Sequence, residues 1–164
     1  MGSRDTIDTS SASETGRAGV LLGALARPDD VIGLIGGLGA GKTVFAQGLA
    51  EGLGVEGPVP SPTFNLLLVH RGGRLPFFHF DLYRLDRLEE LVDIDFREAL
   101  ESGGVAAVEW ADRFPSEMPG DRLDVVFAAI DETRRSLAPC ATGPRGRDLA
   151  RRWLEVWHSE VDRP

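Results

Sequence analysis

Residues 36–43 read Gly-Gly-Leu-Gly-Ala-Gly-Lys-Thr, and this stretch decides the expected fold. It matches the phosphate-loop pattern G-x-x-x-x-G-K-[ST] without a mismatch. The apolar run at 31–35 precedes it as a predicted strand, and a helical pattern follows over 42–53. Because the spacing and both flanking elements fit, the stretch predicts a loop that binds a nucleoside triphosphate. The alternative is a glycine-rich turn that binds nothing.

Each residue type in this loop has a chemical reason to be there. Glycines let successive backbone N–H groups turn toward phosphate oxygens, and the helix that follows adds the positive end of its dipole. Lys42 is expected to reach the β- and γ-phosphates and to act in catalysis, and the Thr43 hydroxyl to bind Mg²⁺. Lys42 is the only lysine among the 18 Lys and Arg residues, and its compact ammonium fits a phosphate site better than a guanidinium does. The loop residues expected to contact the nucleotide are Gly36, Gly37, Leu38, Gly39, Ala40, Gly41, Lys42 and Thr43.

The composition is that of an acidic globular protein, with 42% hydrophobic and 27% charged residues. A formal net charge of −8 argues against a protein that holds nucleic acid by itself, since neutralisation of phosphates supplies most of that affinity. The single cysteine, Cys140, excludes an internal disulfide and fits a reducing compartment. No apolar run is long enough for a membrane span or a signal peptide. We therefore expect a cytoplasmic protein that contacts neither a membrane nor nucleic acid directly.

The rest of the chain predicts alternating helices and strands. Residues 1–12 are rich in Ser, Thr and Asp and are expected to form a flexible tail before a single P-loop ATPase domain over 13–164. The turn at 71–74 predicts that two neighbouring strands pair as an antiparallel hairpin. The predicted helices are 13–26, 42–53, 85–100 (broken near Asp93) and a last one from Asp148; the predicted strands are 31–35, 64–70, 75–83, 105–110, 123–130 and 135–141. This order predicts a three-layer α/β sandwich of the P-loop NTPase type with a mixed central sheet.

Two acids are candidates to complete the site. Glu109 directly follows a run of small apolar residues, where it is expected to bind Mg²⁺ together with Thr43; the alternative is a surface acid at a strand end. Asp81 lies within a strand of aromatic residues, where a charge is costly unless it is paired or functional. It is expected to orient the attacking water or a water on the magnesium. The alternative is a buried ion pair with Arg84 or another arginine.

Two further residues are interpreted from their position. Thr63 follows a stiff proline segment, and it is expected either to contact the γ-phosphate, in the manner of a switch threonine, or to be an ordinary loop residue. His79 is interpreted as a hydrogen-bonded structural residue rather than a catalyst. The period of a strand places His79, Asp81 and Tyr83 on one face and the intervening aromatic and apolar residues on the other.

Four motifs occur in order: Gly-Leu-Gly-Ala-Gly-Lys-Thr at 37–43, Ser-Pro-Thr-Phe at 61–64, His-Phe-Asp-Leu-Tyr-Arg-Leu at 79–85 and Glu-Trp at 109–110. Together they resemble the TsaE (YjeE) family. The resemblance implies the bacterial ATPase of tRNA threonylcarbamoyladenosine biosynthesis, with ATP and Mg²⁺ as cofactors. It implies Thr43 and Glu109 as metal ligands and Asp81 as a functionally sensitive position. It further implies Thr15, Trp110 and Arg135 as residues at the nucleotide.

The resemblance also implies two partner proteins of one fold, of the TsaB and TsaD types, which form the enzyme that modifies the adenosine beside the anticodon. No motif identifies an arginine finger in the chain. Because phosphoryl transfer without such a stabilising cation loses a factor of ~10³–10⁵ in rate, we expect the isolated protein to hydrolyse ATP slowly. One alternative is a small-molecule P-loop kinase, although no arginine-lined lid is recognisable. Another is a regulatory GTPase, which would need an [NT]-K-x-D segment and hence a second lysine.

Overall fold

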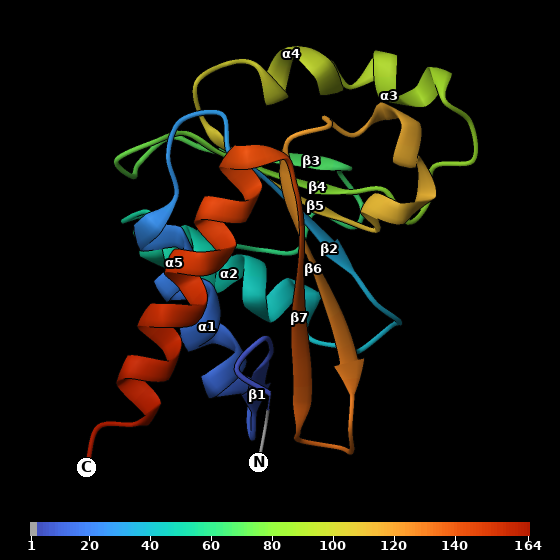
Figure 1. Ribbon diagram of the computed structural model, residues 1–164. Helices are drawn as coiled ribbons and strands as arrows, with labels where there is room; N and C mark the ends of the chain where they lie inside the picture. Colours follow the sequence, from blue (N-terminus) through green and yellow to red (C-terminus); the bar gives the residue numbers. More distant parts are fainter. Residues whose placement is uncertain (1–2) are drawn as a thin grey trace.

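In the computed structural model, which describes residues 3–164, the strands form one seven-stranded sheet of order β1-β7-β6-β2-β5-β4-β3 (Figure 1). The strands are β1 Ile7–Thr9, β2 Val31–Ile35, β3 Leu67–His70, β4 Phe77–Asp81, β5 Val105–Glu109, β6 Arg122–Ala129 and β7 Arg135–Thr142. The helices are α1 Ala12–Leu25, α2 Lys42–Gly52, α3 Glu89–Asp93, α4 Phe96–Leu100 and α5 Gly143–Val161, with short 3₁₀ turns at Ala111–Arg113 and Pro115–Glu117.

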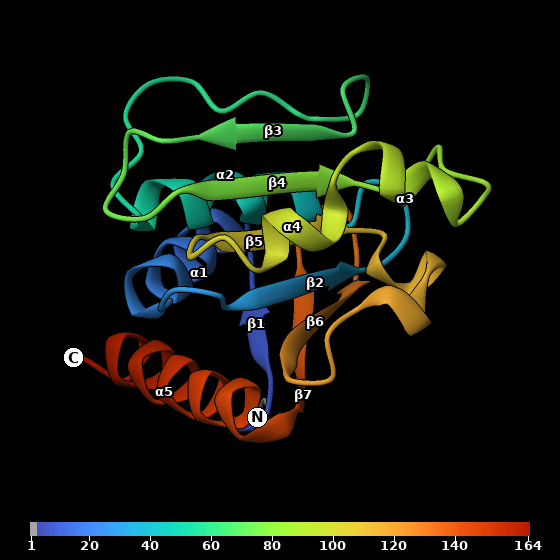
Figure 2. The same cartoon turned by 90° about the horizontal axis from the view of Figure 1, so that it is seen from above.

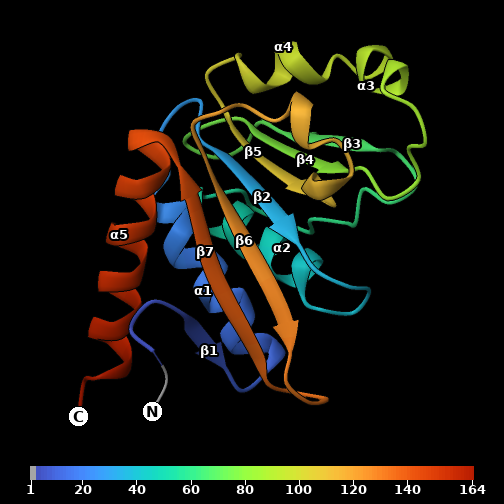
Figure 3. The ribbon, with the colours of Figure 1, turned by 45° about the vertical axis from the view of Figure 1, so that its right-hand side comes forward.

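The sheet is mixed, as the sequence predicts. Its centre is parallel, with β6, β2, β5 and β4 side by side, and the β3–β4 hairpin at one edge is antiparallel. At the other edge β7 and β1 are also antiparallel to their neighbours. Helices α1, α2 and α5 cover one face and α3 and α4 the other, which gives the three layers (Figures 2 and 3). The carboxyl ends of the parallel strands β2, β4 and β5 therefore lie at one edge of the sheet, where ligands bind in folds of this class.

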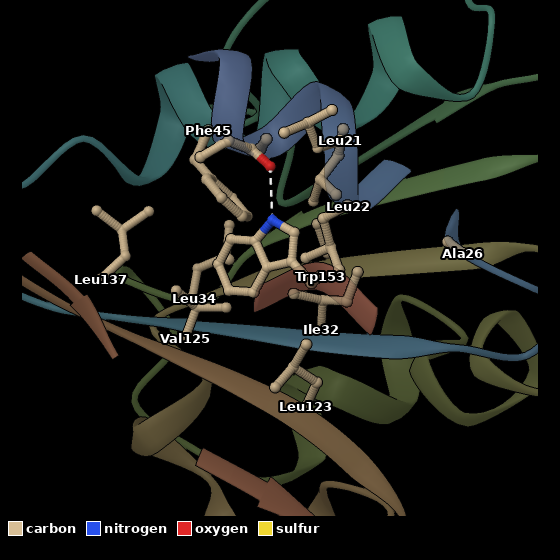
Figure 4. Close-up of a cluster of buried hydrophobic side chains, with 14 of the residues drawn as sticks. Leu21, Leu22, Ala26, Ile32, Leu34, Phe45, Leu123, Val125, Leu137 and Trp153 are labelled. Carbon is tan, nitrogen blue, oxygen red and sulfur yellow. Dashed lines mark hydrogen bonds between the residues drawn. The ribbon is translucent and has the colours of Figure 1, made fainter. Parts of the chain in front are cut away.

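The larger core lies between the sheet and helices α1, α2 and α5 (Figure 4). Trp153 of α5 is fully buried there, and its indole N–H donates to the carbonyl oxygen of Ala18 at 2.9 Å. The ring of Trp153 packs against Phe45 of α2 at a centroid distance of 5.7 Å, nearly edge to face. Trp153 thus joins all three helices of this layer over the sheet.

Glycines hold α1 and α2 together at backbone distance. A Cβ atom at Gly19 or Gly23 of α1 would collide with carbonyl oxygens of α2, and one at Gly48 or Gly52 would collide with carbonyl oxygens of α1. The two helices therefore touch through their main chains, without side chains between them. Because α2 begins at Lys42, this contact fixes the helix that carries the phosphate loop.

The N-terminal prediction is wrong in part. Residues 7–9, predicted within a flexible tail, form β1, which pairs with β7 and buries Ile7 completely. Helix α1 starts at Ala12 because the Ser11 side chain accepts the N–H of Glu14 as its N-cap. The first two residues lie outside the described part of the chain.

Other element boundaries also differ from the prediction: helix α3 starts at Glu89 rather than 85, and strand β4 spans Phe77–Asp81 rather than 75–83. Strand β3 starts at Leu67 rather than 64, because a turn in which Pro62 accepts the N–H of Asn65 and of Leu66 occupies the preceding residues. Helix α5 starts at Gly143 rather than 148; a proline in its first turn, Pro144, fits this earlier start. The break between α3 and α4 falls at Ile94–Asp95, next to the predicted Asp93.

Candidate functional site

The phosphate loop joins the carboxyl end of β2 to the first turn of α2. Gly39 and Gly41 have φ values of 73° and 103°, in the left-handed region where glycine carries no steric penalty. Gly41 is also the residue that caps the amino end of α2. The free N–H groups of that helix end and the positive end of its dipole therefore lie at the loop, which suits a phosphate group.

Lys42 turns its side chain back over this loop. Its ammonium donates to the carbonyl oxygens of Gly36 and Gly37, the latter at 2.7 Å, and lies 4.1 Å from the centre of the Trp110 ring. Burial lowers the pKa of Lys42, and the nearby carboxylates of Glu109 and Asp81 oppose that shift. The ammonium is thus held next to the loop, where it can bind phosphate oxygens.

The hydroxyl of Thr43 donates to Oε1 of Glu109 at 2.9 Å. Glu109 is only 3% exposed, so it is not a surface acid, and its other oxygen lies 2.6 Å from Nε2 of His79. Hydroxyl and carboxylate oxygens are the ligands that Mg²⁺ prefers, so this pair fits one end of a magnesium site. Among residues 3–164, no cluster of three or more His, Cys, Asp or Glu side chains forms a metal site from protein groups alone.

Asp81 ends β4 directly beside Glu109 at the end of β5, because the two residues are register partners in the parallel pair. One oxygen of Asp81 accepts the Thr63 hydroxyl at 3.1 Å and the other accepts the N–H of Tyr83 at 3.0 Å. Within the described residues, Asp81 forms no ion pair. The guanidinium of Arg84 lies over the Phe64 ring instead, 4.5 Å from its centre. The alternative of a buried Asp81–Arg84 pair is therefore not what the structure contains.

These side chains surround a single cavity of about 340 Å³. It is lined by Leu38, Gly39, Ala40, Gly41, Lys42, Thr43, Val44, Thr63, Asp81, Tyr83, Glu109 and Trp110. Gly36 and Gly37 are not part of the lining, but their carbonyl oxygens hold Lys42 at its edge. Tyr83 is a wall residue that sequence reasoning did not select, although the strand period places it on the same face as Asp81. Its ring packs against Trp110 at 5.0 Å between centroids.

A second depression adjoins the first across the phosphate loop, sharing Gly39, Gly41 and Val44 with it. It contains both remaining candidates, Thr15 and Arg135, together with Glu132 and Thr133. The Thr15 hydroxyl bonds to that of Thr9 at 2.7 Å, and Arg135 donates to the carbonyl oxygen of Gly39 at 3.1 Å. Glu132 and Thr133 lie in the turn between β6 and β7, where no motif in the sequence indicates a site.

A phosphate loop follows the central parallel strand β2, and acids end β5 and β4, the next two strands on one side of β2. This arrangement defines a P-loop nucleotide-binding protein. The model of one family, described as "Threonylcarbamoyl adenosine biosynthesis protein TsaE", matches residues 9–137. The chain belongs to the TsaE family.

Known proteins support this assignment over most of the chain. The tRNA threonylcarbamoyladenosine biosynthesis protein TsaE of Treponema pallidum (strain Nichols) is 40% identical over 127 residues, which cover 77% of this chain and 93% of the relative. The protein of the same name from Bacillus subtilis (strain 168) is 39% identical over 137 residues, 84% of this chain and 85% of the relative. The crystal structure of Bacillus subtilis YdiB superposes on this chain with a TM-score of 0.77 at 34% sequence identity. The superposition covers 96% of this chain and 95% of the YdiB chain.

Proposed function

We propose that this protein binds ATP with Mg²⁺ at the phosphate loop and hydrolyses it slowly, in service of the threonylcarbamoyl modification of adenosine next to the anticodon of tRNA. The observation that carries the proposal is that Lys42, Thr43, Asp81 and Glu109 meet at one cavity although they come from three separate segments. The pathway comes from relatives named for tRNA threonylcarbamoyladenosine biosynthesis.

Each side chain of the cavity has a proposed part. The backbone N–H groups of the loop and the ammonium of Lys42 bind the phosphates, and Thr43 with Glu109 holds Mg²⁺. When bound, the ion neutralises charge on the phosphates. Since no group of three or more His, Cys, Asp or Glu side chains among the described residues could hold a metal ion, we propose that the metal binds together with the nucleotide. Asp81, fixed by Thr63 and by the Tyr83 N–H, orients the attacking water.

The nucleoside is proposed to occupy the adjoining depression. Thr15 lines this depression, and we propose that it makes van der Waals contact with the nucleoside. Its hydroxyl already forms hydrogen bonds with the Thr9 hydroxyl and the carbonyl oxygen of Ser11. The guanidinium of Arg135 is held on the carbonyl oxygens of Gly39 and Asp131, at one side of the same depression. Trp110 forms the wall of the cavity beside Lys42, where the phosphates are proposed to bind.

Partner proteins are part of the proposal. The chain has a formal net charge of −8, so we propose that TsaB-type and TsaD-type proteins hold the tRNA and that this protein acts on them. We also propose that the chain acts as one ATPase domain in the cytoplasm, with β1 as part of its sheet. Within residues 3–164, no helix combines the length and the hydropathy that crossing a bilayer requires.

Two measurements test the function. Calorimetric titration with ATP, with and without Mg²⁺, is expected to show binding that the metal strengthens. Formation of threonylcarbamoyladenosine in a reconstituted mixture with TsaB-type and TsaD-type partners is expected to depend on the wild-type chain and to fail with Lys42→Ala. Modification that proceeds equally without this chain would contradict the proposal. Transfer of the γ-phosphate to nucleosides or small alcohols in excess of hydrolysis would identify a kinase instead.

A further inference from the structure

His79 is the most deeply buried ionisable side chain near the site. It lies in the middle of β4, between Leu68 of β3 and Ala107 of β5, and has no exposed surface. Its Nε2 atom is 2.6 Å from Oε2 of Glu109, the carboxylate whose other oxygen accepts the Thr43 hydroxyl. The contacts therefore run from His79 through Glu109 to Thr43, and His79 itself does not line the cavity.

The surroundings of His79 indicate which ring nitrogen carries the hydrogen. Within the described residues, Nδ1 of His79 is buried and has no hydrogen-bond partner. A hydrogen on Nδ1 would leave a buried donor unsatisfied and would point the bare Nε2 at a carboxylate oxygen. A hydrogen on Nε2 forms a short charge-assisted bond instead. The imidazole ring of His79 also stacks on the ring of Phe77, with 5.8 Å between the ring centroids and an interplanar angle of 27°.

Glu109 needs such a partner. It is almost completely buried, and the contacts that its two oxygens make among residues 3–164 are those to His79 and Thr43. A carboxylate with one free oxygen can rotate about its last side-chain torsion, which is broad and soft. A donor on Oε2 stops that rotation and leaves Oε1 beside Thr43.

We propose that His79 is a positioning residue that, through an Nε2–H bond to Oε2, fixes the Glu109 carboxylate so that Oε1 faces the magnesium position beside Thr43. The inference rests on the proposed function, in which Thr43 and Glu109 hold Mg²⁺. Partners of this kind around a metal ligand change metal affinity by about 10- to 100-fold. His79 is expected to act on the metal alone, and the affinity for ATP without metal should not depend on it.

Two variants of equal polarity separate this role from a merely structural one. Glutamine places its amide N–H near the position of Nε2, whereas asparagine reaches only the position of Nδ1. His79→Asn is expected to reduce the Mg²⁺-induced gain in ATP affinity by about tenfold or more, and to leave the affinity without Mg²⁺ unchanged. His79→Gln is expected to retain most of the gain. In a Glu109→Gln background, His79→Asn is expected to add no further loss.

Calorimetry with and without Mg²⁺ decides among the outcomes. An unchanged Mg²⁺ effect in His79→Asn, an equal loss of ATP affinity with and without the metal, or an additive loss in the Glu109→Gln background would each overturn the inference. A wild-type protein that binds ATP without any Mg²⁺ effect would instead contradict the proposed function, and with it the magnesium position.

A second readout uses the wild-type protein without any ligand and remains valid if the His79 variants do not fold. Nitrogen-15 NMR of the imidazole side chains is expected to show a hydrogen on Nε2 of His79. That signal should shift in Glu109→Gln, which replaces the accepting oxygen pair by an amide. An Nε2 atom without hydrogen in the wild type would overturn the inference.

Discussion

The ammonium of Lys42 lies 4.1 Å from the centre of the Trp110 ring, and Trp110 has a positive φ of 61°. A bulky residue in this left-handed backbone conformation carries a conformational energy cost, and it occurs only where contacts with the surrounding structure offset that cost. Trp110 directly follows β5, and its N–H donates to the carbonyl oxygen of Leu34 in β2. The two central strands therefore fix the ring against which the lysine side chain rests.

Replacement of Lys42 is expected to remove nucleotide binding. Charge-assisted hydrogen bonds contribute about 1.5–3 kcal/mol each, so Lys42→Ala should weaken ATP binding by about 100-fold or more. Lys42→Arg keeps the charge but places a broad guanidinium between the loop and Trp110, and should also bind poorly. Calorimetry measures both. Wild-type affinity in Lys42→Ala would show that the nucleotide binds elsewhere.

Replacement of Glu109 is expected to affect the metal more than the nucleotide. Glu109→Gln should lose about tenfold or more of the Mg²⁺-dependent gain in ATP affinity, while binding without Mg²⁺ changes little. Glu155→Gln is the matched control, because this acid lies on α5 and lines neither the cavity nor the adjoining depression. An equal Mg²⁺ effect in both variants and in the wild type would remove Glu109 from the metal site.

The glycine contact between α1 and α2 predicts opposite effects of two chemically identical substitutions. A Cβ atom at Gly48 would collide with the carbonyl oxygen of Gly16, so Gly48→Ala should destabilise the fold by about 1–3 kcal/mol. A Cβ atom at Gly16 would meet only the Val44 side chain, at 3.7 Å. Gly16→Ala should therefore be neutral or stabilise the helix by up to about 1 kcal/mol.

Thermal unfolding checks this pair, since each kcal/mol changes Tm by about 2–4 °C in a domain of this size. If Gly48→Ala melted at or above the wild-type temperature, the two helices would not be packed at backbone distance.

Arg74 caps the carboxyl end of α1 from outside the helix. Its guanidinium donates to the carbonyl oxygens of Gly23, Ala24 and Ala26, in the last turn and at the C-cap of the helix, where backbone carbonyl groups lack the full set of helical partners. Arg74→Ala should lower stability by about 1–2 kcal/mol, as expected for a few partly exposed bonds from a charged donor. Arg71→Ala, which changes an exposed arginine of the same turn, should have little effect on the urea midpoint. Equal midpoints for both variants would contradict the capping role.

The sequence predicts the centre of this fold better than its edges. Strand β2 occupies residues 31–35 as predicted, because a motif and an apolar run coincide there. Strand β1 was missed since three residues show no periodicity, and only pairing with β7, more than 120 residues later, makes Ile7 a core residue. Such contacts between distant segments are not encoded in any local window.

In the site too, local sequence patterns indicate residues, whereas contacts between distant segments cannot be predicted. The sequence indicates Glu109 because it ends an apolar strand, and Asp81 because a charge within a strand of aromatic residues is costly unless it is paired or functional. The parallel register then brings the two acids side by side. The bond from His79 to Glu109 could not be predicted, since strand period gives the face of a residue but not its partner. Glu132 and Thr133 belong to a hairpin turn whose sequence resembles that of any exposed turn.

The absence of side chains between α1 and α2 has a mechanical consequence. Two helices in main-chain contact cannot slide or rotate past each other without breaking van der Waals contacts along their whole length. Helix α2 and the start of the phosphate loop therefore form a fixed wall of the cavity, and we expect any movement that accompanies binding of the proposed nucleotide to lie in the other lining segments, around Thr63 and Tyr83.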